Sequence, residues 1–226
     1  MSFDLHDHMA KMARTVSAGE RDGVETIVVH AARTYSTHAL DLWGALTEPE
    51  RSSRWFLPVS GDLREGGRYQ LEGNAGGTIE ACVPTERLDV TWEYGGGVSW
   101  LAVRLIPEPD GTRLELEHEA HPMPGFSDRF GPGAVGVGWD LGFMGLARHL
   151  DDPERFRAPP EADGWETSPE AMDFYRATSD AWGRAAIRAG TPQEEALAAA
   201  EATRTFYSGE TSPPAGRDAS DAGEEA

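Results

Sequence analysis

The feature that most constrains the fold is a series of short segments with alternating apolar residues, separated by turns rich in glycine and proline. The last segment shows the alternation clearly, because Leu114, Leu116 and His118 fall on one face and charged residues on the other. Short connections and one wet face are typical of antiparallel hairpins. The series predicts an antiparallel sheet with these strands: Arg68–Glu72, Thr78–Val83, Arg87–Tyr94, Val98–Ile106 and Thr112–Ala120.

A long helix is predicted after the strands, over Gly133–Asp151. Trp139, Phe143, Leu146 and Leu150 recur there at helical spacing and form an apolar stripe suited to lying against a sheet. The segment also contains several glycines, which lower helix propensity and indicate close packing or a kink at a cavity. The order of elements predicts an α+β fold in which a sheet wraps around this helix.

One further strand and two small helices are predicted before the sheet series. Gly23–Ala32 is rich in β-branched residues and is predicted as the first strand, followed by a helix with Ser36 or Thr37 at its N-cap. A second helix is predicted to begin at Pro49 and to end at Trp55-Phe56.

Two capped helices, Glu170–Arg188 and Gln193–Phe206, are predicted near the end of the chain. They are too apolar to lie free in solvent, so we expect them to pack on the domain, on each other or in a homodimer interface. The sequence divides into an N-terminal extension (1–21), a sheet domain (22–151), a linker (152–167), a helical extension (168–207) and a disordered acidic tail (208–226).

Composition excludes several classes of partner and compartment. The formal net charge of −19 argues against nucleic acid as a partner, because a phosphate-binding surface needs a basic patch. Cys82 is the single cysteine, so an internal disulfide is impossible. No stretch is long and apolar enough for membrane insertion, and the first residues lack the apolar core of a signal peptide. We therefore expect a cytoplasmic protein.

Four stretches carry a resemblance to a known family: ALTEPERSSRWF, GDLREGGRYQLEG, IEACVPTERLDVTWEY and GTRLELEHEA, in that order. The series resembles the SRPBCC superfamily, whose fold is called START-like or helix-grip. Within it, the chain is similar to the bacterial branch named for homologues of the heat-shock protein 90 ATPase activator. The resemblance covers about Asp22–Asp151. It implies a curved sheet that grips the long helix and a cavity between them for an apolar small molecule.

The candidate ligand-binding residues are mostly aromatic, with one histidine that shares a strand face with leucines. Each aromatic residue also suits the core, whereas His118 would orient a ligand, act as an acid–base group or be a core histidine with a protein partner. The set is Trp55, Phe56, Tyr69, Trp92, Trp100, His118, Trp139 and Phe143.

Known motifs of catalysis are missing from the sequence. It contains no phosphate-binding loop, no HExxH, no GxSxG and no Cys/His cluster with metal-ligand spacing, so no cofactor, metal or catalytic residue is predicted. Binding of an apolar or amphipathic small molecule is the leading hypothesis. The alternatives are a cyclase or aromatase that uses the same cavity, which the superfamily includes, and an interaction protein that regulates a chaperone.

Overall fold

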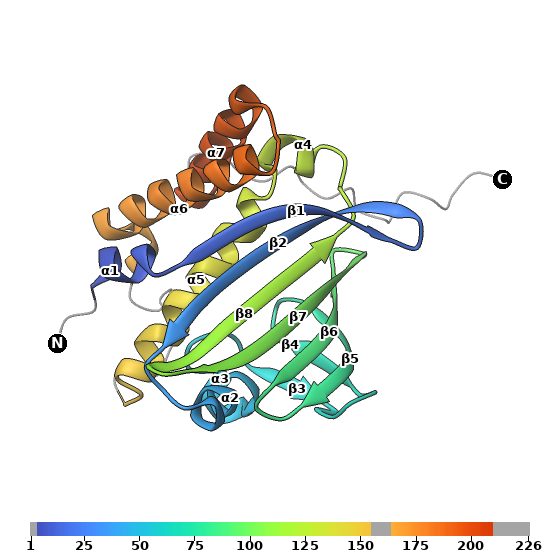
Figure 1. Ribbon diagram of the computed structural model, residues 1–226, viewed down its shortest axis with the longest axis vertical. Coiled ribbons are helices and arrows are strands. Elements are labelled where there is room, and N and C mark those ends of the chain that lie inside the picture. The colour runs from blue at the N-terminus through green and yellow to red at the C-terminus, as the bar shows by residue number, and fades with distance from the viewer. Residues whose placement is uncertain (1–3, 155–163, 210–226) are drawn as a thin grey trace.

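The computed structural model describes residues 4–154 and 164–209, and its main feature is one antiparallel sheet of eight strands in the order β1-β2-β8-β7-β6-β5-β4-β3. Figure 1 shows the strands crossing in front of one long helix. The strands are β1 Ala13–Arg21, β2 Val24–Tyr35, β3 Val59–Gly61, β4 Arg68–Leu71, β5 Gly76–Val83, β6 Arg87–Tyr94, β7 Gly97–Glu108 and β8 Gly111–Ala120. The predicted antiparallel sheet is confirmed.

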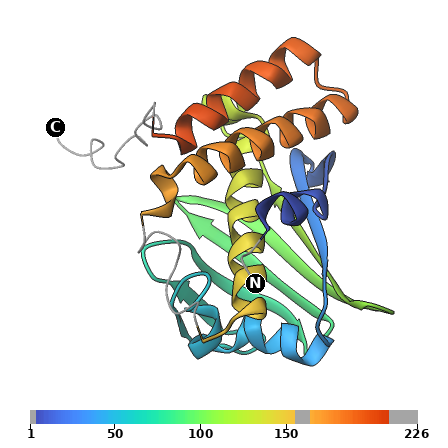
Figure 2. The ribbon, with the colours of Figure 1, turned by 90° about the vertical axis from the view of Figure 1, so that its left-hand side faces the viewer.

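The long helix is α5, and it covers one face of the sheet, as Figure 2 shows. Its bounds, Gly133–Asp151, are those that the apolar stripe predicts. The remaining helices are α1 Leu5–Ala10, α2 Ala39–Thr47, α3 Pro49–Ser52, α4 Phe126–Phe130, η2 Trp165–Thr167 (a 3-10 helix), α6 Pro169–Arg188 and α7 Gln193–Tyr207. The predicted helix-grip architecture with two additional C-terminal helices is therefore confirmed.

The N-terminal residues differ from the prediction. Within residues 1–21, which the sequence predicted to lie outside the domain, the structure forms α1 and the edge strand β1. β1 pairs with β2 from Ala13 opposite Ala32 to Arg21 opposite Val24. Asp22 and Gly23 join the strands with φ values of +54° and +77°, as expected for a tight hairpin turn of the Asp-Gly type. The apolar pattern of β1 is weak because an edge strand that is largely exposed needs few apolar residues.

Three local predictions also need correction. The N-cap of α2 is His38 rather than Ser36 or Thr37. The helix that begins at Pro49 ends at Ser52, so Trp55 and Phe56 lie in the connection to β3. α4 lies between β8 and α5, in a segment where the sequence predicts no helix. Most of the predicted linker and the predicted disordered tail lie outside the described residues.

The C-terminal helix α6 packs on the domain through a buried polar cluster. The Asp140 side chain on α5 is fully buried, and its carboxylate accepts hydrogen bonds from Arg14 Nε on β1 (2.9 and 3.1 Å) and from Trp182 Nε1 on α6 (2.9 Å). Burial raises the pKa of Asp140 to about 6, although the hydrogen bonds from Arg14 and Trp182 oppose that rise. These three residues, here called the Asp140 cluster, tie the first strand and α6 to the long helix.

Candidate functional site

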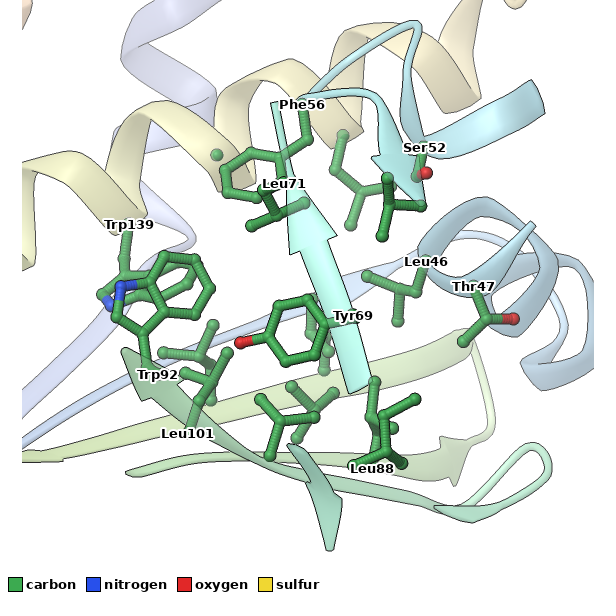
Figure 3. Close-up of a pocket in the computed structure, with 18 of the residues that line it drawn as sticks. Leu46, Thr47, Ser52, Phe56, Tyr69, Leu71, Leu88, Trp92, Leu101 and Trp139 are labelled. Atoms are coloured by element: carbon green, nitrogen blue, oxygen red, sulfur yellow. The ribbon is translucent and has the colours of Figure 1, made fainter. Parts of the chain in front are cut away.

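A cavity of about 200 Å³ lies between the sheet, α5 and the segment that runs from α2 to Phe56. Alternate residues of the central strands provide the sheet wall, because every second side chain of a strand points to the same face. Figure 3 shows Trp92 and Trp139 together at one end of the cavity, and Leu46 and Thr47 on the far side. The cavity occupies the place where the sequence resemblance implies a ligand site.

Six of the eight predicted residues line this cavity. They come from three parts of the structure, namely the connection after α3, the strands β4 and β6, and the helix α5. The six are Trp55, Phe56, Tyr69, Trp92, Trp139 and Phe143. The structure thus brings together side chains that are distant in the sequence.

Trp100 lies on the other face of the sheet. Its neighbour Leu101 points into the cavity, so Trp100 on the same strand points away. The Arg21 guanidinium stacks over the Trp100 ring at 4.1 Å from its centroid, and the His121 ring meets it edge-on at 5.5 Å. The prediction that Trp100 lines the cavity is therefore corrected.

His118 is buried next to the cavity but is not part of its lining. Its Nδ1 accepts a hydrogen bond from Trp139 Nε1 at 2.9 Å, and its Nε2 lies 2.7 Å from Ser99 Oγ. An indole N–H can only donate, so the neutral imidazole carries its proton on Nε2 and donates it to Ser99. Ser99 Oγ in turn donates to the Trp92 carbonyl at 3.1 Å. Burial lowers the pKa of His118 to about 4, so the ring is neutral at ordinary pH.

The aromatic rings at the His118 end of the cavity touch one another. The Phe56 and Trp139 rings stack with centroids 6.2 Å apart, and Trp92 meets Trp139 edge-on at 5.3 Å. Trp55 Nε1 donates to the Ala45 carbonyl at 2.9 Å, which joins the connection after α3 to α2. Such offset and edge-on arrangements are the favoured geometries of aromatic pairs.

The polar groups of the lining are few, and most are already bonded within the protein. Tyr69 donates its hydroxyl proton to the Thr91 carbonyl at 2.8 Å, and burial raises the pKa of Tyr69. Thr47 donates to the Trp43 carbonyl at 2.8 Å. The Ser52 hydroxyl and the Cys82 thiol also belong to the lining. Among the described residues, no Asp, Glu, Lys, Arg or His side chain lines the cavity.

Sequence reasoning missed the aliphatic part of the lining. Leu88 and Val90 on β6, and Leu114 and Leu116 on β8, alternate with polar residues and point into the cavity. The alternation of apolar and polar residues along each strand was the signal that could have identified them. Gly142 on α5 also faces the cavity, and a glycine within a helix gives no indication of direction by itself.

Comparison with known proteins assigns the family. The Activator of Hsp90 ATPase homolog 1-like protein family matches residues 36–151, which is just over half of the chain. The chain belongs to that family. CalU16 from Micromonospora echinospora is similar to this member of the family, with 31% identity, a TM-score of 0.63 in its crystal structure, and coverage of 78% of this chain and 98% of CalU16.

The similarity to CalU16 extends past α5. Residues 1–151, which end with α5, make up about two thirds of the chain, whereas the match covers 78% of it. The match therefore includes residues beyond Asp151. DynU16, a protein of the dynemicin biosynthetic locus, matches with 20% identity and a TM-score of 0.51 over 57% of this chain and 49% of DynU16, which shows likeness of fold. No match is found among the curated proteins.

Two further properties concern the part of the family member that the structure describes. None of its helices is both long and apolar enough to cross a membrane. No group of three or more His, Cys, Asp or Glu side chains within residues 4–154 and 164–209 is placed to hold a metal ion.

Proposed function

We propose that this family member binds a small, uncharged, apolar molecule in the cavity between the sheet and α5. The observation that carries the proposal is the composition of the lining, in which aromatic and aliphatic side chains surround the cavity and the described residues contribute no charged group. Ligand pockets are typically apolar with a few polar groups that orient the ligand. Removal of apolar ligand surface from water, at about 25 cal/mol per Å², would supply most of the affinity.

The size of the cavity narrows the class of ligand. Its volume is about 200 Å³. An engineered apolar cavity of roughly 150 Å³ is known to bind benzene, so a molecule with one or two aromatic rings is a suitable size. The stacked and edge-on rings of Phe56, Trp92 and Trp139 suit a flat ligand.

The charge of the ligand is a second property that the cavity restricts. An anionic ligand would lose its hydration in the cavity without meeting a cation from the described lining, and the chain as a whole carries a net charge of −19. We therefore infer that neutral molecules bind and that carboxylates of the same shape do not.

A matched pair of probes tests this proposal. 2-Acetylnaphthalene and 2-naphthoate have similar shapes, but only the second is charged at neutral pH. We expect the neutral probe to quench tryptophan fluorescence and to slow alkylation of Cys82, the single cysteine, which lies in the cavity wall. The anionic probe should do neither.

The control is Gly142→Leu, which places a side chain in the cavity. It should abolish protection of Cys82 by the neutral probe, whereas Trp100→Phe, on the other sheet face, should leave it intact. Equal protection by both probes would contradict the charge criterion. No protection by any neutral one- or two-ring probe, with no small molecule released from the native protein on denaturation, would contradict the binding function itself.

The two other hypotheses stay predictions. A cyclase needs a group that moves protons, and the described lining offers hydroxyls and one thiol, while both ring nitrogens of His118 already have partners. The chaperone hypothesis derives from the family name, and no feature of the cavity favours it.

A further inference from the structure

Three consecutive hydrogen bonds connect the long helix to three strands beside the cavity. They run from Trp139 on α5 to His118 on β8, from His118 to Ser99 on β7, and from Ser99 to the Trp92 carbonyl on β6. The strand register brings these groups together, because Trp92 lies opposite Ser99, and His118 lies opposite Leu101 on the next strand. Every donor in the series therefore has one acceptor.

The series begins and ends at residues that line the cavity. Trp139 and Trp92 are the two rings in contact at this end, whereas His118 and Ser99 lie behind them and do not line the cavity. The Trp139 indole would have to leave its hydrogen bond to rotate. An unmet N–H in an apolar interior is unfavourable, so the bond selects one orientation of the ring.

We propose that His118 is a positioning residue that holds the Trp139 ring across the end of the cavity and so determines which apolar molecules fit. This inference rests on the proposed binding function, because it assigns a role within the same site. In this role His118 does not contact the ligand. Its imidazole orients the Trp139 ring, and that ring lines the cavity in which the molecule binds.

The electrostatic surroundings of His118 support this role. The groups that face it are Trp139 on α5, Ser99 on β7 and Trp92 on β6, and its partner in the β2 register is Val29. None of these side chains is charged, and burial alone lowers the pKa of His118. The acceptor at Nδ1 is therefore present at neutral pH. Protonation at low pH would place N–H groups on both sides of the ring, and the Trp139 indole would lose its acceptor.

The first test uses the protein without any ligand. Because the Trp92 and Trp139 centroids are 5.3 Å apart, the two indoles should give an exciton signal in far-ultraviolet circular dichroism, which Trp139→Phe assigns by removing it. We expect His118→Leu to lose most of this signal, because its apolar side chain cannot accept the Trp139 hydrogen bond. His118→Asn should retain the signal, since its amide oxygen can take the place of Nδ1.

The wild-type signal should also respond to acid. It should stay constant from neutral pH down to about pH 5 and decline near pH 4, where His118 gains its second proton. His118→Asn should not show this step. A signal that survives in His118→Leu, or that is lost equally in His118→Asn, would overturn the proposal.

The second test measures selectivity. The affinity ratio between naphthalene and toluene should change roughly fivefold in His118→Leu, the factor that corresponds to one net hydrogen bond, and return in His118→Asn. If His118→Leu fails to fold, Ser99→Ala removes the second and third bonds of the series, and the same signal and ratio should shift in the same direction by less. If neither quantity moves in Ser99→Ala, the proposal fails. If no probe binds the wild-type protein, the binding function fails, and the exciton signal still decides the role of His118.

Discussion

Two positions on different sides of the helix α5, Gly142 and Gly136, are packed in opposite ways. On the side toward the cavity, a methyl group added at Gly142 would have its nearest neighbour, the Phe56 ring, at 3.9 Å. On the side toward α6, a methyl group added at Gly136 would lie 2.3 Å from the Trp182 ring. A methyl group at the first glycine would meet its neighbours at ordinary van der Waals distance, whereas the second glycine allows Trp182 to lie directly on the helix backbone. Figure 2 shows α6 crossing α5 on this side.

The two sides also differ in polarity. Trp139 and Asp140 are consecutive residues, yet Trp139 lines the apolar cavity and Asp140 is the centre of the buried cluster with Arg14 and Trp182. On the side that joins α5 to β1 and α6 the buried contacts include a charged pair, whereas the His118 hydrogen bonds on the cavity side are neutral. The cavity side leaves room at Gly142, while Gly145, further along the same helix, lies close to the Trp55 backbone.

The largest expected effect comes from the Asp140 cluster. Asp140→Leu alone should lower the free energy of unfolding by about 3–5 kcal/mol, because it leaves the Arg14 charge buried without its partner. Arg14→Met with Asp140→Leu should recover most of this loss, since an apolar pair needs no buried charge. Urea unfolding of the two variants and the wild type measures the difference. A double variant as unstable as the single one would show that the cluster contributes more than charge compensation.

The same variants give a pH dependence of known sign. The pKa of Asp140 is about 6 in the folded protein and about 3.8 for an ordinary Asp. Between these values the folded state holds a proton that the unfolded state lacks, so stability falls as pH rises. Between about pH 4 and pH 6, the free energy of unfolding of the wild type should thus fall by roughly 3 kcal/mol relative to that of the double variant. The opposite slope would mean that Arg14 lowers the pKa of Asp140 more than burial raises it.

The third prediction tests the close packing at Gly136 on α5. Gly136→Ala should lower the free energy of unfolding by about 1–3 kcal/mol, because Trp182 must move to admit the methyl group and its hydrogen bond to Asp140 is then strained. Thermal and urea unfolding measure the loss, and ligand binding should be unaffected in the fraction that is folded. A variant as stable as the wild type would show that α6 can shift at little cost.

Most of the fold could be predicted from the sequence because the order of apolar and polar residues in an element indicates which of its faces is buried. β8 has one wet and one dry face, α5 carries apolar residues at helical spacing, and α6 has Ser168 as its N-cap, whose hydroxyl accepts from the Ala171 N–H at 3.1 Å. β1 escaped detection because, as an edge strand, it buries little. The Asp22-Gly23 pair, a strong hairpin signal, was the available clue.

Among the strand residues of the site, the prediction agreed with the structure only where the opposite face of the strand is polar. Tyr69 and Trp92 were placed correctly for that reason. On β7 both faces carry apolar residues, Trp100 and Ala102 on one and Leu101 and Val103 on the other, so the sequence could not decide which face meets the helix. The partners of His118 lie 19 and 21 residues away in the chain, and only the assembled sheet and helix bring them within hydrogen-bond distance.

The smallest effect on stability is expected on the loose side, and it separates stability from binding. Gly142→Ala should raise the free energy of unfolding by up to about 1 kcal/mol, because alanine favours the helix and its methyl group meets no atom closer than 3.9 Å. The same methyl group reduces the space for a ligand, so the affinity for 2-acetylnaphthalene should fall. Urea unfolding and fluorescence titration of one variant measure both effects.

Gly136→Ala is the matched control, with the opposite sign in stability and no effect on affinity. A Gly142→Ala variant that is more stable and still binds the probe at full affinity would place the bound molecule away from α5, against the sheet. A variant that loses stability would show that this side of the helix is as closely packed as the other, and the contrast between the two sides would not hold.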